Sequence, residues 1–141
     1  MIVLDTGALY AAMDANEPLH GACVAALAGS RPPRLLSPFV LAELDYLVGR
    51  RIGRAGQAAV LDEVVRGAYR LEPFGVDDVR EAQAVLARWS DLDLGIADAS
   101  VLVLANRHRT LDVLTTDLWH FRALRGAGDR PLRLLPADAH D

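Results

Sequence analysis

The chain contains no lysine, because all 15 of its basic residues are arginine. This absence excludes mechanisms that need a lysine of the chain itself, such as the phosphate-binding lysine of P-loop enzymes and Schiff-base chemistry. It also counts against response-regulator domains and many aspartate-based phosphatases, which place a lysine beside the reacting aspartate. Arginine remains well suited to bidentate contacts with phosphate groups.

Cysteine and long apolar runs are also scarce. Cys23 is the only cysteine, so no internal disulfide can form and the chain is compatible with a reducing compartment. The longest apolar run, residues 99–105, is interrupted by Ser100 and is far shorter than the roughly 20 residues that span a bilayer. The first residues, Met-Ile-Val-Leu-Asp, lack the basic segment of a secretory signal. We therefore expect a cytoplasmic protein.

The remaining composition is typical of a globular protein. The chain has 141 residues, of which 52% are hydrophobic and 24% charged, and its formal net charge is −4. This length and composition predict one domain over residues 1–141. The acidic balance argues against a general polyanion-coating protein, although a local basic patch remains compatible with it.

Short apolar runs alternate with helical patterns along the chain. Strands are expected at residues 2–4, 35–36, 69–72, 113–114 and 132–135. Helices are expected near residues 19–27, 37–48, 54–66, 79–89 and 96–105, the last being apolar almost all round and therefore central. This alternation predicts an α/β fold with a mainly parallel central sheet flanked by helices.

Two aspartates occupy equivalent places, each directly after a predicted strand. Asp5 follows the strand at 2–4, and Asp117 follows the strand at 113–114. Because ligands of open α/β sheets bind outside the carboxyl ends of the strands, we expect both carboxylates to face one crevice. A loop or helix-capping role is the alternative for each of them.

Two further acids lie on predicted helices. Glu43 falls about one turn from Val40 and Leu47, which predicts a place at the edge of the buried face, although a solvated helical glutamate has the same spacing. Asp98 lies in the first turn of the central helix, where burial of an unpaired carboxylate is costly. The helix N-terminus offsets only about 0.3–1 kcal/mol, so we expect a cation or an arginine beside Asp98. A capping role or a salt bridge is the alternative interpretation.

Four carboxylates that share one crevice repel one another unless positive charge lies among them. Without lysine, a hard divalent cation with oxygen ligands, Mg²⁺ or Mn²⁺, is the natural solution. Such an ion beside a crevice indicates metal-assisted hydrolysis of a phosphodiester. This chemistry is a hypothesis drawn from the acids alone.

Four segments together resemble the PIN-domain ribonucleases, and more narrowly the VapC toxins of bacterial VapBC toxin–antitoxin pairs. They are Met-Ile-Val-Leu-Asp5-Thr6, Ser37-Pro-Phe-Val-Leu-Ala-Glu43-Leu, Gly95-Ile-Ala-Asp98-Ala-Ser100 and Leu114-Thr-Thr-Asp117 with His120-Phe121. The resemblance covers nearly the whole chain and implies a Mg²⁺- or Mn²⁺-dependent endoribonuclease. The residues that it implies as catalytic and metal-binding are Asp5, Glu43, Asp98 and Asp117.

The same resemblance implies partners and supporting residues. It implies a homodimer, a cognate VapB-type antitoxin and a structured RNA substrate, either rRNA or tRNA. Thr6 and Thr116 match positions where the family often has a hydroxyl near the metal site. Gly7 departs from the pattern, because family members often carry serine or asparagine there.

Two other function classes stay open. One is a PIN-like module that binds RNA or protein without cutting, and the other is a Mg²⁺-dependent phosphatase or phosphotransfer domain. The Asp-Thr-Gly sequence at 5–7 matches the aspartic protease signature, but those enzymes are all-β. Zinc is not expected, because the histidines show no metal-ligand spacing; they are His20, His108, His120 and His140.

Arginines and aromatic residues near the motifs are candidates for RNA contacts. Arginines cluster at 50–54, 107–109 and 122–125, which predicts a phosphate-binding rim, with helix-terminal or solvated arginines as the alternative. Trp119, beside Asp117, is a candidate base-stacking residue, although tryptophan is more often part of a core.

Overall fold

A computed structural model describes residues 1–139, and His140 lies outside the described residues. Its described strands form one sheet with the order β3-β2-β1-β4-β5. They are β1 (Ile2–Leu4), β2 (Arg34–Leu36), β3 (Arg70–Leu71), β4 (Asp112–Leu114) and β5 (Arg133–Leu135). Every pairing between these strands is parallel, so the predicted α/β fold with a mainly parallel sheet is confirmed.

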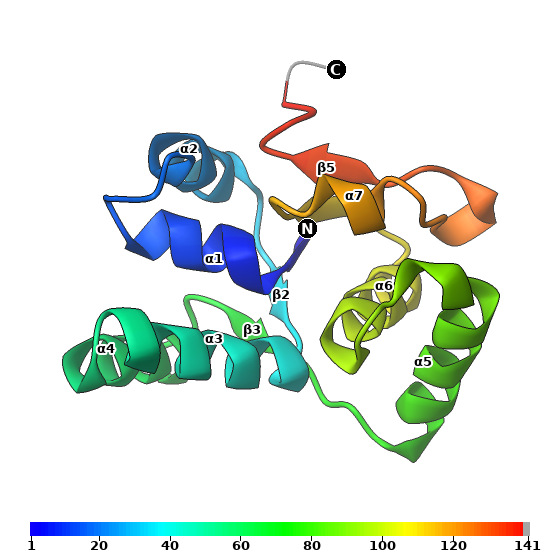
Figure 1. Ribbon diagram of the computed structural model, residues 1–141, viewed down its shortest axis with the longest axis horizontal. Helices are drawn as coiled ribbons and strands as arrows, with labels where there is room; N and C mark the ends of the chain where they lie inside the picture. The colour runs from blue at the N-terminus through cyan, green and yellow to red at the C-terminus, as the bar shows by residue number, and fades with distance from the viewer. Residues whose placement is uncertain (140–141) are drawn as a thin grey trace.

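Helices flank the sheet (Figure 1). They are α1 (Thr6–Met13), α2 (His20–Gly29), α3 (Pro38–Arg51), α4 (Arg54–Val65), α5 (Val76–Arg88), α6 (Ile96–His108) and α7 (Leu118–Phe121), with 3₁₀ turns η1 (Ser90–Leu92) and η2 (Ala127–Asp129). Consecutive helices pack in pairs, α1 on α2, α3 on α4 and α5 on α6. In the part of the chain described here, no helix has the length and apolarity needed to cross a membrane.

The helix α6 lies at the centre of the molecule, as its all-round apolar sequence predicts. Residues 99–105 of this helix are all buried, and α6 contacts α3, α5, β1 and β4. The helix begins at Ile96, so its first turn carries Asp98, whose charge acts on Asp5 at the end of β1. This largely buried helix therefore positions one of the predicted site acids.

Two local predictions need correction. The helix α1 was not expected after Asp5, because five of its eight residues are buried and it therefore shows no amphipathic period. In α2 the expected apolar face packs only in part, since Cys23 is its one fully buried residue and Leu19, just before it, is 46% exposed. Gly29 is the last residue of this helix, and Ser30 is its C-cap.

A buried pair of hydroxyls joins α3 to α6. Ser37 caps α3 by accepting a hydrogen bond from the Phe39 amide over 3.1 Å. Its Oγ lies 2.6 Å from Ser100 Oγ, and Ser100 in turn donates to the Ala97 carbonyl over 2.6 Å. Since the Ser100 proton is used for Ala97, the Ser37 hydroxyl is the donor between the two serines.

Ser100→Ala is expected to reduce the free energy of unfolding by about 1–3 kcal/mol. The substitution leaves the fully buried Ser37 hydroxyl without its acceptor, and a buried unsatisfied donor costs about that much. Urea unfolding measures the change, with the exposed Ser90→Ala as a control that should unfold at the wild-type midpoint. An unchanged midpoint for Ser100→Ala would show that the hydroxyl chain contributes nothing to stability.

Candidate active site

The strand-end aspartates are connected by one buried hydroxyl. Asp5 is 6% exposed, and its Oδ2 accepts a hydrogen bond from Thr115 Oγ1 over 2.7 Å. The same Oγ1 accepts a hydrogen bond from the Asp117 amide over 2.9 Å. Because β1 and β4 are neighbours, with Leu4 paired to Leu114, these contacts hold both aspartates at one carboxyl edge of the sheet.

Asp98 shares this environment from the first turn of α6. Its Oδ2 accepts a hydrogen bond from the Gly95 amide over 3.1 Å, which is a capping interaction. The capping alternative is therefore correct. It is compatible with a site role, because the cap uses only Oδ2 and does not involve the other carboxylate oxygen of Asp98. The side chain is half-buried, less than we expected, and the charge of His120 only partly opposes the increase in its pKa that burial causes.

The carboxylates of the site interact electrostatically. Burial raises the pKa of Asp5 to about 6; the Thr115 hydrogen bond opposes this increase, whereas the charges of Asp98 and Asp117 add to it. Burial likewise raises the pKa of Asp98; the Gly95 amide opposes this shift, and the charges of Asp117 and Glu43 reinforce it. The structure therefore brings all four predicted acids into one negatively charged neighbourhood.

Glu43 enters this neighbourhood from α3. It is exposed, which corrects the expectation that it lies at the edge of the buried face: the buried stripe of α3 consists of Val40, Leu44 and Val48, and Glu43 lies about 100° round the helix from Leu44. Its Oε1 nevertheless accepts a hydrogen bond from Thr6 Oγ1 over 2.8 Å. This contact fixes the carboxylate against the start of α1.

Asp117 forms a pair with His120. The Oδ1 atom of Asp117 caps α7 by accepting a hydrogen bond from the His120 amide over 3.1 Å, and its Oδ2 lies 2.6 Å from His120 Nδ1. This hydrogen bond raises the pKa of the His120 imidazole. The imidazole of His120 is thus held beside the acids.

Thr115 is the functional residue that sequence reasoning missed. The resemblance favoured Thr116, but neighbouring residues at the end of a strand point to opposite faces, so only one of the two threonines can reach Asp5. Thr116 instead lies close to Gly7, where an added Cβ would come within 2.9 Å of Thr116 Oγ1. Gly7 thus leaves room for the Thr116 side chain.

For the metal-dependent RNA cleavage that the resemblance implies, Thr115→Val is expected to lower kcat/KM by about 10–100-fold, the usual cost of losing a group that orients a metal ligand. Without the Thr115 hydroxyl, the pKa of Asp5 should also rise, since this hydrogen bond lowers it. The measurement is kcat/KM for RNA cleavage between pH 5 and pH 8. Thr115→Ser, which keeps the hydroxyl, should behave as wild type, and a valine variant with the wild-type profile would contradict the assigned role.

The donor set fits a hydrated hard cation. Among residues 1–139, no three His, Cys, Asp or Glu side chains are grouped closely enough to bind one ion together. All donors of the acidic neighbourhood are oxygens, and Mg²⁺ usually keeps several waters while it binds one or two carboxylates directly. The arrangement is thus compatible with Mg²⁺ or Mn²⁺ bound partly through water.

Several arginines of the predicted rim have structural partners instead. Arg51 pairs with Glu17 over 3.1 Å, and Arg107 pairs with Asp78 over 2.9 Å. Arg122 binds Asp138 through two nitrogens, at 2.7 and 2.5 Å. For these three residues the structural alternative is the better interpretation.

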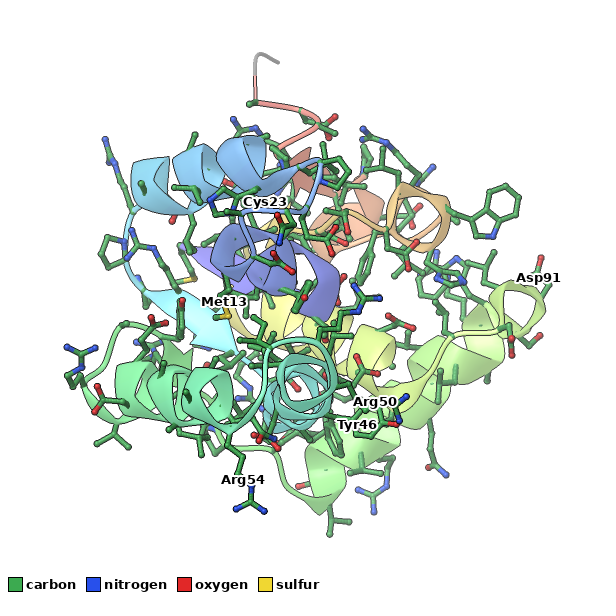
Figure 2. The ribbon with its side chains drawn as sticks, turned by 60° about the vertical axis from the view of Figure 1, so that its left-hand side comes forward. Met13, Cys23, Tyr46, Arg50, Arg54 and Asp91 are labelled. Carbon is green, nitrogen blue, oxygen red and sulfur yellow. The ribbon has the colours of Figure 1, made fainter. Side chains whose placement is uncertain are left out.

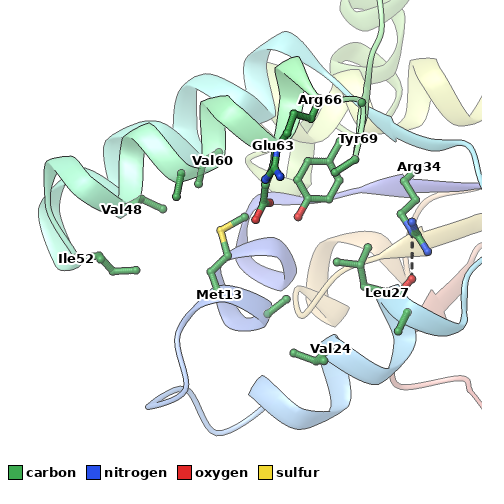
Figure 3. Close-up of a pocket in the computed structure, with 16 residues that line it drawn as sticks. Met13, Val24, Leu27, Arg34, Val48, Ile52, Val60, Glu63, Arg66 and Tyr69 are labelled. Carbon is green, nitrogen blue, oxygen red and sulfur yellow. Dashed lines mark hydrogen bonds between the residues drawn. The ribbon is translucent and has the colours of Figure 1, made fainter.

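A separate hollow of about 890 Å³ lies between the α1–α2 and α3–α4 pairs (Figure 3). Its lining is mostly aliphatic, with Val24, Leu27 and Val60 among the residues that Figure 3 labels, and Arg34, Glu63 and Arg66 add charge. None of the four site acids lines it. The hollow is therefore separate from the acidic site.

Comparison with known proteins identifies the family. A family model described as PIN domain matches residues 2–126, and the chain therefore belongs to the PIN-domain family. Within that family it is of the VapC type: ribonuclease VapC26 of Mycobacterium tuberculosis is 41% identical over 135 residues, which cover 96% of this chain and 100% of that protein.

Solved structures share the fold at lower identity. The Mycobacterium tuberculosis toxin VapC20, described as cleaving the sarcin-ricin loop, superposes with a TM-score of 0.75 at 23% identity, over 80% of this chain and 87% of that one. VapBC2 from Rickettsia felis, bound to a DNA fragment from its promoter, has a TM-score of 0.65 at 19% identity, over 95% of this chain and 98% of that one. These likenesses confirm the architecture.

Proposed function

We propose that this protein is a metal-dependent endoribonuclease toxin that hydrolyses phosphodiester bonds of a structured cytoplasmic RNA, either rRNA or tRNA. The observation that carries the proposal is the pair of hydrogen bonds through Thr115 that joins Asp5 to Asp117 at one carboxyl edge of the sheet, with the charge of Asp98 close enough to raise the pKa of Asp5. Two relatives support it, since VapC26 is named a ribonuclease and VapC20 a toxin that cleaves the sarcin-ricin loop. The choice of rRNA or tRNA as the target of this chain is likewise a proposal.

We propose Mg²⁺ as the cofactor, with Mn²⁺ as a functional substitute. The residues that would hold the ion are Asp5, Glu43, Asp98 and Asp117. When bound, such an ion lowers the pKa of a water and offsets charge on phosphoryl oxygens.

The chain's own residues hold these carboxylates in place before any substrate arrives. Thr115 fixes Asp5, Thr6 fixes Glu43 and the Gly95 amide fixes Asp98. Each of these three carboxylates is therefore oriented by an uncharged hydrogen-bond donor. Such fixed orientation reduces the reorganisation that the site undergoes during reaction.

We propose a VapB-type antitoxin and a second copy of the chain as protein partners. The proposal is supported by solved neighbours that are toxin–antitoxin complexes, VapBC2 among them, and by the mostly aliphatic hollow between α1–α2 and α3–α4. Co-expression with a VapB-type antitoxin, followed by light scattering of the purified complex, tests both partners. Failure of the two proteins to co-purify would contradict the antitoxin as a partner. A monomeric toxin after removal of the antitoxin would contradict the homodimer.

The test of the proposed activity uses antitoxin-free protein and total cellular RNA. Reactions contain Mg²⁺, Mn²⁺ or EDTA, and cut ends are mapped by primer extension. We expect discrete cuts that need the metal and disappear with EDTA. Folded protein that makes no cuts, or cuts that persist in EDTA, would overturn the proposal.

A further inference from the structure

Two aromatic side chains remain exposed beside the acids. Tyr46 is 66% exposed and Trp119 is 79% exposed. Tyr46 lies one helical turn after Glu43 on α3, and Trp119 lies two residues after Asp117 on α7. Each exposed ring is therefore carried by the same short segment as a site acid.

The tyrosine shares a hollow with the site. A depression of about 510 Å³ is lined by Tyr46, Glu43, Thr6, Ala42 and Leu47, so the phenol ring borders the space that the Thr6–Glu43 pair faces. A neighbouring arginine holds the Tyr46 ring on one side.

Arg50 is the residue that holds the Tyr46 ring. It places its guanidinium carbon 5.8 Å from the ring centre and donates a hydrogen bond to the phenol oxygen over 3.3 Å. Figure 2 shows the two side chains together at the outside of α3. The ring is thus oriented, retains most of its surface for a ligand and has a positive charge beside it.

The tryptophan is presented on a fixed backbone. Phe121, on the same turn, is fully buried and anchors α7 in the core. The Asp117 cap holds the other end of the turn through the His120 amide. An indole exposed on such an anchored turn is available to a ligand, and an aromatic ring gains from burial or stacking.

On the basis of the proposed function, we propose that Tyr46 and Trp119 are stacking platforms for unpaired RNA bases near the bond that is cut. Aromatic rings bind splayed-out bases of loops, bulges and single strands, whereas bases of a duplex are stacked on one another and unavailable. Arg50 adds a cation for the phosphate that accompanies a base stacked on Tyr46. By binding these bases, the two rings would place unpaired segments of a structured RNA beside the acids.

The test measures binding of two RNA probes, a short oligouridine and a blunt RNA duplex, to the full chain. The Asp98→Asn background prevents cutting during the measurement. Stacking is worth about 5- to 150-fold in affinity per base, so Tyr46→Ala and Trp119→Ala should each weaken oligouridine binding by that factor. Tyr46→Phe and Trp119→Phe keep a ring and should stay near the parent, as should Val65→Ala, an exposed aliphatic control on α4.

Several outcomes would overturn the stacking proposal. One is unchanged oligouridine affinity in both alanine variants, and another is tighter binding of duplex than of oligouridine. A third is a change in oligomeric mass in either alanine variant, because the ring would then belong to a contact between copies. The metal-dependent cleavage of total RNA by the wild type is scored separately, so a failure of stacking and a failure of the proposed nuclease are distinguishable.

Discussion

Asparagine in place of Asp98 is expected to lower RNA cleavage by more than about 10²-fold while the protein stays folded. Losing an outer-shell group of a metal site typically costs 10–100-fold, and a direct ligand is worth more. The fold should survive, because an asparagine oxygen can still accept the Gly95 amide and cap α6. Neutralising one carboxylate also relieves repulsion with Asp117.

The measurement for Asp98→Asn is kcat/KM on an RNA with a mapped cut, together with the far-ultraviolet circular dichroism spectrum. Asp91→Asn is the matched control, since Asp91 is an exposed acid on η1, outside the acidic neighbourhood. It should cleave at the wild-type rate. Full activity in Asp98→Asn would remove Asp98 from the metal site.

Asparagine in place of Asp5 is expected to stabilise the metal-free protein by up to about 3 kcal/mol at pH 7 while abolishing cleavage. Folding raises the pKa of Asp5 from its ordinary 3.8 to about 6, and that difference corresponds to about 3 kcal/mol. The folded state binds the proton more tightly, so wild-type stability should fall as the pH rises from about 4 to 6 and then level off. An asparagine at position 5 does not ionise, so the variant should lack this dependence of stability on pH.

Urea unfolding in EDTA across this pH range measures the effect of Asp5→Asn. Mg²⁺ should stabilise the wild type, because a ligand that binds the folded state shifts the equilibrium, and should have little effect on the variant. At limiting Mg²⁺, cleavage by the wild type should decline as the pH falls, since a proton on Asp5 competes with the metal. A variant less stable than the wild type at pH 7 would contradict this explanation.

Much of the fold follows from local patterns in the sequence. The apolar run after Gly95 predicts a buried central helix, and Ser37-Pro38 predicts the start of α3. Asp5 and Asp117 could be placed at one sheet edge because parallel strands end on the same side. The helix α1 could not be predicted, since burial on nearly all sides removes the period that reveals a helix.

The finer geometry of the site depends on tertiary contacts that no spacing reveals. The choice of Thr115 over Thr116 depends on how β4 pairs with β1, and the exposure of Glu43 depends on how α3 rotates about its axis. The metal dependence, the RNA target and the site roles of the four acids stay predictions. The hydrogen bonds through Thr115 that join Asp5 to Asp117, however, are a property of the folded chain.

The most direct measurement is anomalous diffraction from crystals of the antitoxin-free protein soaked in Mn²⁺. We predict an anomalous peak within coordination distance of a carboxylate oxygen of Asp5 or Asp98, with water-mediated contacts to Asp117 and Glu43. The same peak should be absent from crystals of Asp98→Asn. Saturating Mn²⁺ that leaves this edge of the sheet without a peak would contradict the metal site, and with it the proposed mechanism.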